Sequence, residues 1–216
     1  MKLNTIQIRD LQERLCNNDQ EAFAALYRLF FMRLFQFTKM YVHNRETAEE
    51  LVNDIMLKLW HRRSEVLKIQ NLETYLFVSA RNKSLNYLSQ RSPFHISLEP
   101  ESGEIEIVNT DDPEKILEWR QIYELLMQAV EELPDQCRTV FKLIKEEGMS
   151  YKQVAEILDL SPRTVETQLF RAMKKLHKSL DNYMDTNTRS SKLPGSSSIL
   201  PPESSIVLLI LFLDFI

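Results

Sequence analysis

Glycine is scarce in this chain, whose 216 residues contain only three: Gly103, Gly148 and Gly195. Glycine-rich phosphate loops, tight β-hairpins and dinucleotide-binding folds need glycine where the backbone turns sharply or closely approaches a ligand. The sequence therefore argues against nucleotide-binding enzymes and against folds rich in hairpins.

The residue types that build metal sites and covalent catalysis are also sparse. The two cysteines form no Cys-x-x-Cys pattern, so we expect reduced thiols that serve packing. No histidine pairs with Cys or Glu at a metal-binding spacing, and no nucleophile motif occurs. These residues are Cys16, Cys137, His43, His61, His95 and His177. The sequence predicts no catalysis, no metal, no cofactor and no small-molecule substrate.

Long apolar runs are absent except at one end. Residues 1–4 open no apolar run, so we expect no secretory signal and a cytoplasmic protein. The run at 206–216 is about half of the ~20 residues that cross a bilayer. We predict residues 184–216 to be a disordered tail rich in Ser, Thr and Pro. Its apolar end either contacts a partner or a membrane surface or, as we favour, packs back on the fold or stays disordered.

Leucine and long polar side chains are abundant instead, which is typical of helices. Hydrophobic residues make up 44% of the chain and charged residues 27%, an ordinary globular balance. Apolar residues recur at helical spacing over about residues 10–91, and no long alternation predicts a sheet. We predict an all-α protein. Because the net charge is -4, any nucleic-acid binding must rest on local basic patches.

Composition divides the chain into two helical domains, a linker and a tail. The linker carries proline, glycine and acidic residues without a helical stripe, so we predict it to be flexible and acidic. Asn44 and Asn71 are expected to precede or cap helices in the first domain, and Asp112-Pro113 is expected to start the second. The predicted parts are residues 1–91, 92–112, 113–183 and 184–216.

The second domain contains the pattern of a helix-turn-helix. A helix opening at Leu133-Pro134 is expected to end at Gly148 in the left-handed conformation. Ser150 and Gln153 predict a capping box for the next helix. Asp159, where such turns usually have glycine, is expected to take a positive φ. Ser161-Pro162 is then expected to start a third helix that runs to about residue 180.

The two faces of this helix pair differ in polarity. The expected inner face is apolar and consists of Val154, Ala155, Leu158, Leu160, Val165, Leu169 and Ala172. The front of the third helix is polar and its next turns are basic, which suits base edges first and phosphates after. The predicted DNA-binding residues are Arg163, Thr164, Glu166, Thr167, Gln168, Arg171, Lys174 and Lys175, followed by Lys178. The alternative is a helical hairpin with a solvated face; the low acid count favours DNA.

Two separate stretches resemble the extracytoplasmic-function (ECF) subfamily of the sigma-70 family, the specificity subunits of bacterial RNA polymerase. The stretch in the second domain consists of four segments: LPDQCRTVF (133–141), GMSYKQVA (148–155), TVE (164–166) and AMKKL (172–176). In the first domain the stretch is AEELVNDIMLKLW (48–60). Both motifs occur in the family's order, and the likeness covers most of the chain. It implies a region 2 bundle and a region 4 helix-turn-helix.

The resemblance also implies site residues in the first domain. That domain would bind the polymerase core, open the promoter and hold the unpaired strand of the downstream element (about −10), with residues 67–73 as the other wall of the pocket. The helix-turn-helix would read the upstream element (about −35). Strand-binding residues would be Arg81, Asn82, Lys83 and Asn86. Polymerase-binding residues would be Glu50, Asn53, Asp54 and Lys58.

A structural interpretation competes with each of these assignments. Phe77, Leu85 and Leu88 would be core and the neighbouring charges solvated. We favour core for the aromatic residue and function for Arg81, Asn82 and Lys83. On the polymerase-binding helix, the apolar stripe Leu51, Ile55 and Leu59 is predicted to be core.

Three functions are compatible with these features. The favoured one is a sigma factor with polymerase core and promoter DNA as partners, together with an anti-sigma protein implied by the resemblance. The second is a stand-alone helix-turn-helix regulator, which leaves the polymerase-binding motif unexplained. The third is a helical adaptor that binds no DNA.

Overall fold

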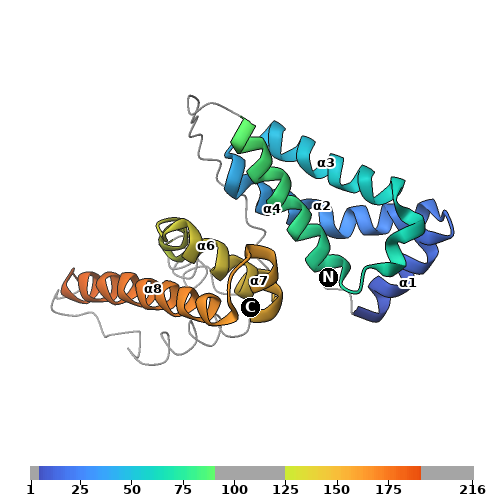
Figure 1. Cartoon of the computed structure of the whole chain (residues 1–216). Helices are drawn as coiled ribbons and strands as arrows, with labels where there is room; N and C mark the ends of the chain where they lie inside the picture. Colours follow the sequence, from blue (N-terminus) through green and yellow to red (C-terminus); the bar gives the residue numbers. More distant parts are fainter. Residues whose placement is uncertain (1–4, 91–124, 191–216) are drawn as a thin grey trace, which may run out of the picture. The chain divides into compact units, whose positions relative to one another are not determined.

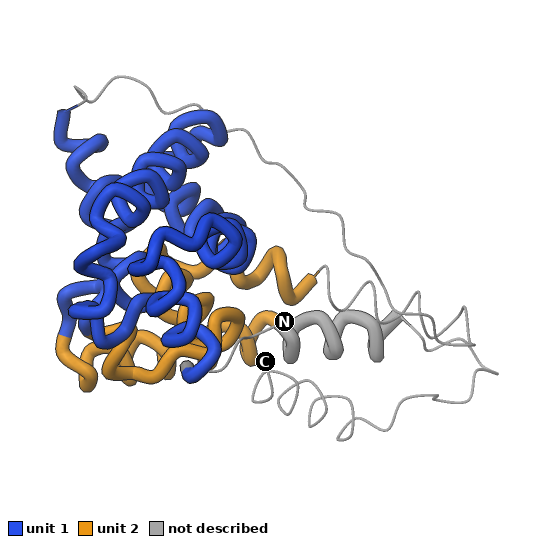
Figure 2. The backbone as a smooth tube through the Cα atoms, turned by 90° about the vertical axis from the view of Figure 1, so that its right-hand side faces the viewer, with its two compact units in different colours: residues 1–102, 156–160 blue, residues 103–155, 161–216 orange. Residues whose placement is uncertain are grey.

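The computed structural model describes residues 5–90 and 125–190. Over these residues the regular elements are helices (Figure 1), so the all-α prediction is confirmed. Contacts divide the chain into two compact units (Figure 2), which are described one at a time. Residues 156–160 share the first unit's colour there and are described with the helix to which they connect. The predicted linker at 92–112 and the predicted helix start at Pro113 lie outside the described residues.

The first unit is a bundle around one central helix. Its elements are α1 (Thr5–Cys16), α2 (Gln20–Val42), α3 (Arg45–His61), the 3-10 helix η1 (Arg63–Lys68) and α4 (Leu72–Gln90). Helix α2 packs against both α3 and α4, which also touch each other, while α1 packs against α2 and η1 (Figure 1). The bundle therefore leaves an outer face on α3 and on α4.

Side-chain caps start α2, α3 and α4, and the sequence predicts those of α3 and α4. The Asn44 side chain accepts a hydrogen bond from the Thr47 N–H at 2.8 Å, and Asn71 accepts one from the Thr74 N–H at 3.0 Å. Asp19 caps α2, and the hydrogen bond from Arg14 holds the pKa of its carboxyl below the usual value.

Aromatic packing fills the core between α2 and α4. Phe77 is fully buried, with its ring centroid 5.1 Å from that of Phe37 in an edge-on arrangement. Arg33 lies over the Phe77 ring and pairs with Glu73. The core interpretation is thus confirmed for Phe77. It is wrong for Leu85 and Leu88, which are 39% and 41% exposed, because the end of α4 carries them on its outer side.

The stripe on α3 is largely as expected. Ile55 and Leu59 are buried, and Leu51 is half-buried.

The second unit is a smaller set of helices. Residues 125–131 are helical, followed by α6 (Asp135–Phe141), the π-helical turn η2 (Lys142–Glu146), α7 (Tyr151–Leu158) and α8 (Pro162–Ser190). Helix α6 packs against α8. The predicted inner face is buried except Leu160, which is half-buried.

The helix ends of this unit also follow the sequence. Gly148 has a φ of 64°, as a left-handed helix stop requires. The Ser150 hydroxyl accepts a hydrogen bond from the Gln153 N–H at 3.3 Å, and the Gln153 carbonyl oxygen accepts one from the Ser150 N–H at 3.0 Å. This reciprocal pair is the predicted capping box.

Helix α8 corrects the predicted start of the tail. It continues to Ser190 and so includes residues 184–190, which the sequence placed in a disordered tail. Five of these seven residues are weak helix formers, but no proline or glycine follows until Pro194 and Gly195, so neither of these helix breakers ends the helix earlier. The apolar run at 206–216 lies outside the described residues. Among the helices that are described, none combines the length and apolarity that a membrane span needs.

Candidate nucleic-acid and polymerase interfaces

Helices α7 and α8 form the predicted helix pair. Helix α7 ends at Leu158 and α8 begins at Pro162, so the turn has three residues. Asp159 in this turn has a φ of 56°, the positive value predicted for it, and aspartate enters this region more readily than most residues. The Ser161 hydroxyl accepts a hydrogen bond from the Thr164 N–H at 3.0 Å and caps α8. This is the geometry of a DNA-reading helix that follows a short turn.

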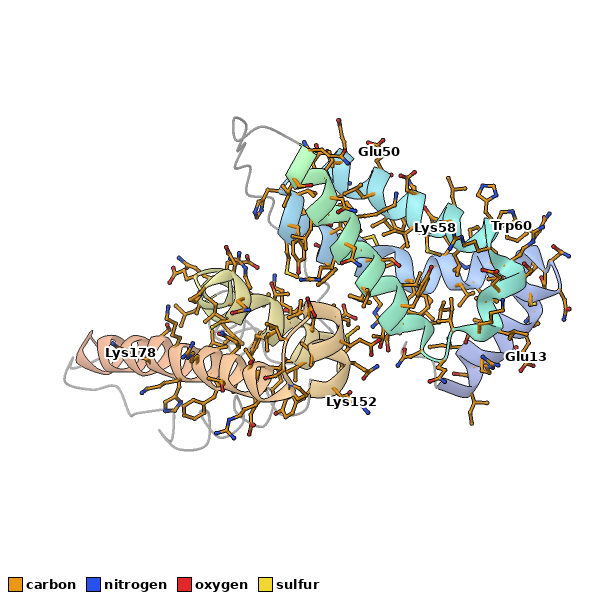
Figure 3. The ribbon with its side chains drawn as sticks, in the orientation of Figure 1. Glu13, Glu50, Lys58, Trp60, Lys152 and Lys178 are labelled. Carbon is orange, nitrogen blue, oxygen red and sulfur yellow. The ribbon has the colours of Figure 1, made fainter. Side chains whose placement is uncertain are left out.

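The outer face of α8 presents charged side chains that form no ion pair with the residues that the structure describes. The predicted contacts Arg163, Glu166, Arg171, Lys174 and Lys175 are exposed, as is Lys178, which Figure 3 labels on this helix. Among the described residues, none of their side chains has an ion-pair or hydrogen-bond partner. Five of the six are cationic, which gives an acidic protein a local surface that attracts phosphates.

Three predicted base-reading residues are instead engaged inside the unit. The Thr164 hydroxyl bonds to the Ser161 hydroxyl at 2.8 Å, and the Thr167 hydroxyl donates to the Arg163 carbonyl at 2.8 Å. Gln168 is more firmly held, by two hydrogen bonds to side chains of α6.

Gln168 connects α8 to α6. Its amide nitrogen donates to the Gln136 side-chain oxygen at 2.8 Å, and its own oxygen accepts from the Cys137 thiol at 3.0 Å. Both ends of the amide are therefore occupied. Gln168 fixes the rotation of α8 against α6, which decides which side chains face outward.

Phe170 is a candidate contact that the sequence analysis missed. It is 69% exposed, seven residues after Arg163 and four before Lys174, so all three lie on one side of α8. An apolar side chain among cations suits the methyl group of thymine, which projects into the major groove. The signal in the sequence was its helical register with Arg163, since the inner positions of α8 are 165, 169, 172 and 176.

The predicted strand-binding residues lie on α4. Asn82 and Asn86 are exposed one turn apart, and Leu85 between them is also exposed. Arg81 is half-buried, and its positive charge acts on Tyr41 of α2. Burial of the Tyr41 hydroxyl raises the pKa of that group, and the charge of Arg81 partly offsets the rise. The face thus offers amides for hydrogen bonds, a cation, and an apolar side chain on which a base can pack.

Lys83 is engaged with a residue predicted for a different role. Its ammonium lies 2.6 Å from the Asp54 carboxylate on α3. A predicted strand-binding residue and a predicted polymerase-binding residue are therefore bound to each other. No spacing in the sequence relates positions on two separate helices, so this pairing was not predictable.

The loop before α4 is held from α1. The Gln12 amide nitrogen donates to the Val66 carbonyl at 2.9 Å and to the Ile69 carbonyl at 3.1 Å, and Gln12 is only 2% exposed. Arg9 also donates to the Leu67 carbonyl at 3.1 Å. These hydrogen bonds hold the start of the segment 67–73, which is predicted to form the other wall of the pocket for the unpaired strand.

The outer face of α3 carries the remaining predicted residues. Glu50 and Lys58 are exposed and stand on α3 together with Trp60 in Figure 3. Leu57, which the sequence analysis did not select, is 53% exposed on the same side, one turn after Asp54 and two after Glu50. Leu57 therefore adds an exposed apolar side chain to this charged face.

Asn53 supports this face rather than extending from it. It is half-buried, and its side-chain oxygen accepts a hydrogen bond from the Tyr27 hydroxyl on α2 at 2.8 Å. Burial raises the pKa of that hydroxyl, and the charge of Glu49 adds to the rise, so the phenol keeps its proton and remains a donor.

Over residues 5–90 and 125–190, no cluster of three or more His, Cys, Asp or Glu side chains is placed to hold a metal ion.

Comparison with known proteins assigns both units to one family. Residues 26–93 match the model of Sigma-70 region 2, and residues 123–176 match that of Sigma-70, region 4. Together the two models match more than half of the chain.

Two curated relatives and a solved structure agree with these matches. RNA polymerase sigma-H factor of Pseudomonas aeruginosa is 24% identical, with 81% of this chain and 94% of the relative covered. ECF RNA polymerase sigma-E factor of Haemophilus influenzae is 25% identical, with 81% and 95% covered. The fold resembles the sigma factor RpoE of Bartonella quintana, solved in complex with the anti-sigma factor NepR, at a TM-score of 0.56 and 21% identity, covering 74% of this chain and 96% of that one. The chain therefore belongs to the sigma-70 family, as a sigma factor of the ECF type.

Proposed function

We propose that this chain binds the RNA polymerase core and directs it to specific promoters. The observation that carries the proposal is that region 2 and region 4 occur in one chain, in the family's order. A stand-alone regulator would need only the second of them. The proposed division of roles gives polymerase and the unpaired strand to the first unit and duplex DNA to the second.

In the second unit, α8 would lie in the major groove of the upstream element. Arg163 at its front is placed for a bidentate contact with guanine, and Phe170 for a thymine methyl. Arg171, Lys174, Lys175 and Lys178 follow along the helix and would neutralise phosphates. Gln168 would act indirectly, since it ties α8 to α6, whereas the Thr164 and Thr167 hydroxyls bond only within α8 and its cap.

In the first unit, α4 would hold the non-template strand of the downstream element. Unstacking a base costs a few kcal/mol, which must be recovered by contacts with the extruded base. Asn82 and Asn86 would supply hydrogen bonds, Leu85 an apolar surface, and Arg81 and Lys83 positive charge. The bonds from Gln12 and Arg9 would keep the loop at 67–73 in position as the opposite wall.

The α3 face, with Glu50, Asp54, Leu57 and Lys58, would contact the polymerase. Its charged residues would mainly guide association and specificity, and Leu57 would supply the apolar contact that a stable interface needs. Because the polymerase carries out RNA synthesis, we expect no catalysis and no cofactor in this chain, and we expect it to act in the cytoplasm.

We also propose that an anti-sigma protein regulates the chain. The support is that the similar sigma factor RpoE of Bartonella quintana was solved in complex with an anti-sigma factor. The apolar run at 206–216 is a candidate contact for a partner or a membrane surface.

A reconstituted transcription assay tests the proposal. The purified chain is added to core polymerase and a promoter library, and transcripts are sequenced. We expect core binding at moderate salt and transcripts that begin downstream of a shared pair of elements. DNA binding without core association would favour a stand-alone regulator, and neither activity would favour a helical adaptor.

Replacing Asn82 with alanine is expected to impair strand opening while duplex binding by α8 persists. The reason is that an exposed amide on α4 is lost without change to the second unit. Opening is measured by permanganate reactivity of thymines in the downstream element, and duplex binding by protection of the upstream element. Normal opening with Asn82→Ala would place the strand pocket elsewhere. Ser89→Ala, two turns further along the same side of α4, serves as the matched control.

A further inference from the structure

Asp54 and Lys83 form an ion pair that joins α3 to α4. The Lys83 ammonium lies 2.6 Å from an Asp54 carboxylate oxygen, and their side chains are 33% and 51% exposed, respectively. A second polar contact between the same helices links the Thr47 and Tyr87 hydroxyls at 3.2 Å. The pair is thus a defined contact at the junction of two outer faces, open to solvent and to partners.

The two members of the pair belong to different surfaces. Asp54 lies on the α3 face between Glu50 and Leu57, and Lys83 adjoins Asn82 on α4. While the carboxylate is in contact with the ammonium, it offsets the positive charge that a DNA phosphate would meet, and it adds a negative charge beside the strand. Neither surface can therefore use its full charge while the pair is intact.

We infer that Asp54 is a positioning residue for Lys83 and that the pair couples the two surfaces. In the free protein, Asp54 holds Lys83 and offsets its charge. When a cationic or hydrogen-bonding group of the polymerase takes over Asp54, Lys83 is released to a phosphate of the unpaired strand. Coupling of this kind is reciprocal, so strand binding at Lys83 also favours polymerase binding at Asp54. This inference rests on the proposed function of the two faces.

The expected size of the effect follows from the exposure of the pair. Exposed ion pairs contribute little, so releasing Lys83 is expected to change strand affinity by about two- to five-fold. A more specific signature is the salt dependence, because each phosphate contact on single-stranded DNA adds about 0.7 to the slope of log affinity against log salt. A change that only loosened the bundle would not add a phosphate contact.

The experiment measures binding of a fluorescent single-stranded oligonucleotide with the downstream-element sequence. The full chain is titrated at several salt concentrations, alone and with saturating core polymerase. The variants are Asp54→Asn, Lys83→Met and the double mutant. Glu46→Gln is the matched control, since it removes an exposed acid of α3 that lies outside the proposed polymerase-binding face and has no ion-pair or hydrogen-bond partner among the described residues.

For the free protein, Asp54→Asn is expected to raise strand affinity about two- to five-fold and to steepen the salt slope by about 0.7. Glu46→Gln is expected to leave the slope unchanged, and Lys83→Met to cancel the gain of Asp54→Asn. If Asp54→Asn behaves like Glu46→Gln while Lys83→Met weakens strand binding in the core complex, the coupling is overturned and the strand site stands. If Lys83→Met has no effect in the core complex either, the proposed strand contact fails and the coupling fails with it.

Discussion

Replacing Arg163 with alanine is expected to abolish discrimination at one position of the upstream element. A bidentate contact between arginine and guanine is worth about 1–3 kcal/mol against the wrong base, or roughly 5- to 150-fold. The Arg163 side chain is exposed, precedes Phe170 on the same side of α8 and has no partner among the described residues, so its loss leaves the fold unchanged. Competition binding with duplexes that vary one base pair at a time measures the effect.

The control for this experiment is Lys175→Ala. Lys175 is exposed further along α8, and its loss should weaken binding about equally on all duplexes and reduce the salt slope by about 0.9. If Arg163→Ala behaves in the same uniform way, Arg163 contacts phosphate rather than a base. Gln168→Ala gives a third pattern in the same assay. Because both ends of the Gln168 amide are bonded to α6, its loss should change discrimination at several base pairs rather than at one.

Replacing Phe77 with alanine is expected to destabilise the first unit by about 3–5 kcal/mol. The ring is fully buried, packs edge-on against Phe37 and lies under Arg33, so its removal leaves a cavity between α2 and α4. Many small domains have a total stability of about 5–15 kcal/mol, so this change approaches the threshold of unfolding. It would also withdraw support from the face of α4 that is proposed to bind the strand.

Urea denaturation followed by Trp60 fluorescence measures this loss. The chain has two tryptophans, so a Trp119→Phe background restricts the signal to the first unit, where Trp60 packs against Phe23. Leu85→Ala is the control: at 39% exposure it should change stability by about 0.5 kcal/mol or less. A similar loss from both substitutions would mean that the end of α4 is buried in solution.

Features that depend on neighbouring residues were predictable from the sequence. The caps at Asn44, Asn71 and Ser161, the capping box and the positive φ of Asp159 all lie where the sequence places them. Each is decided within a few residues of the chain, by a side chain that reaches its own backbone or by the cost of a left-handed conformation. The helix-turn-helix was predictable for the same reason.

Features that depend on how helices pack were not predictable. Leu85 and Leu88 have the apolar character of core residues, and only the packing of α4 leaves them outside. The contact of Lys83 with Asp54 and that of Gln168 with Gln136 join positions that are 29 and 32 residues apart. Such contacts depend on the rotation of each helix about its axis, which a hydrophobic stripe restricts to a broad sector rather than to one side chain.

The buried amide of Gln12 shows that a functional fragment of the first unit must include α1. The family match begins at residue 26, after α1 has ended at Cys16. A fragment trimmed to that match would lack the donor for the carbonyls of Val66 and Ile69, and each buried acceptor left without a partner costs about 1–3 kcal/mol. The two carbonyl groups would then accept hydrogen bonds from water or from another donor, and the loop would shift. A shortened protein that keeps every family motif would thus still lose the rigid approach to its strand-holding helix, so the working module starts before the conserved one.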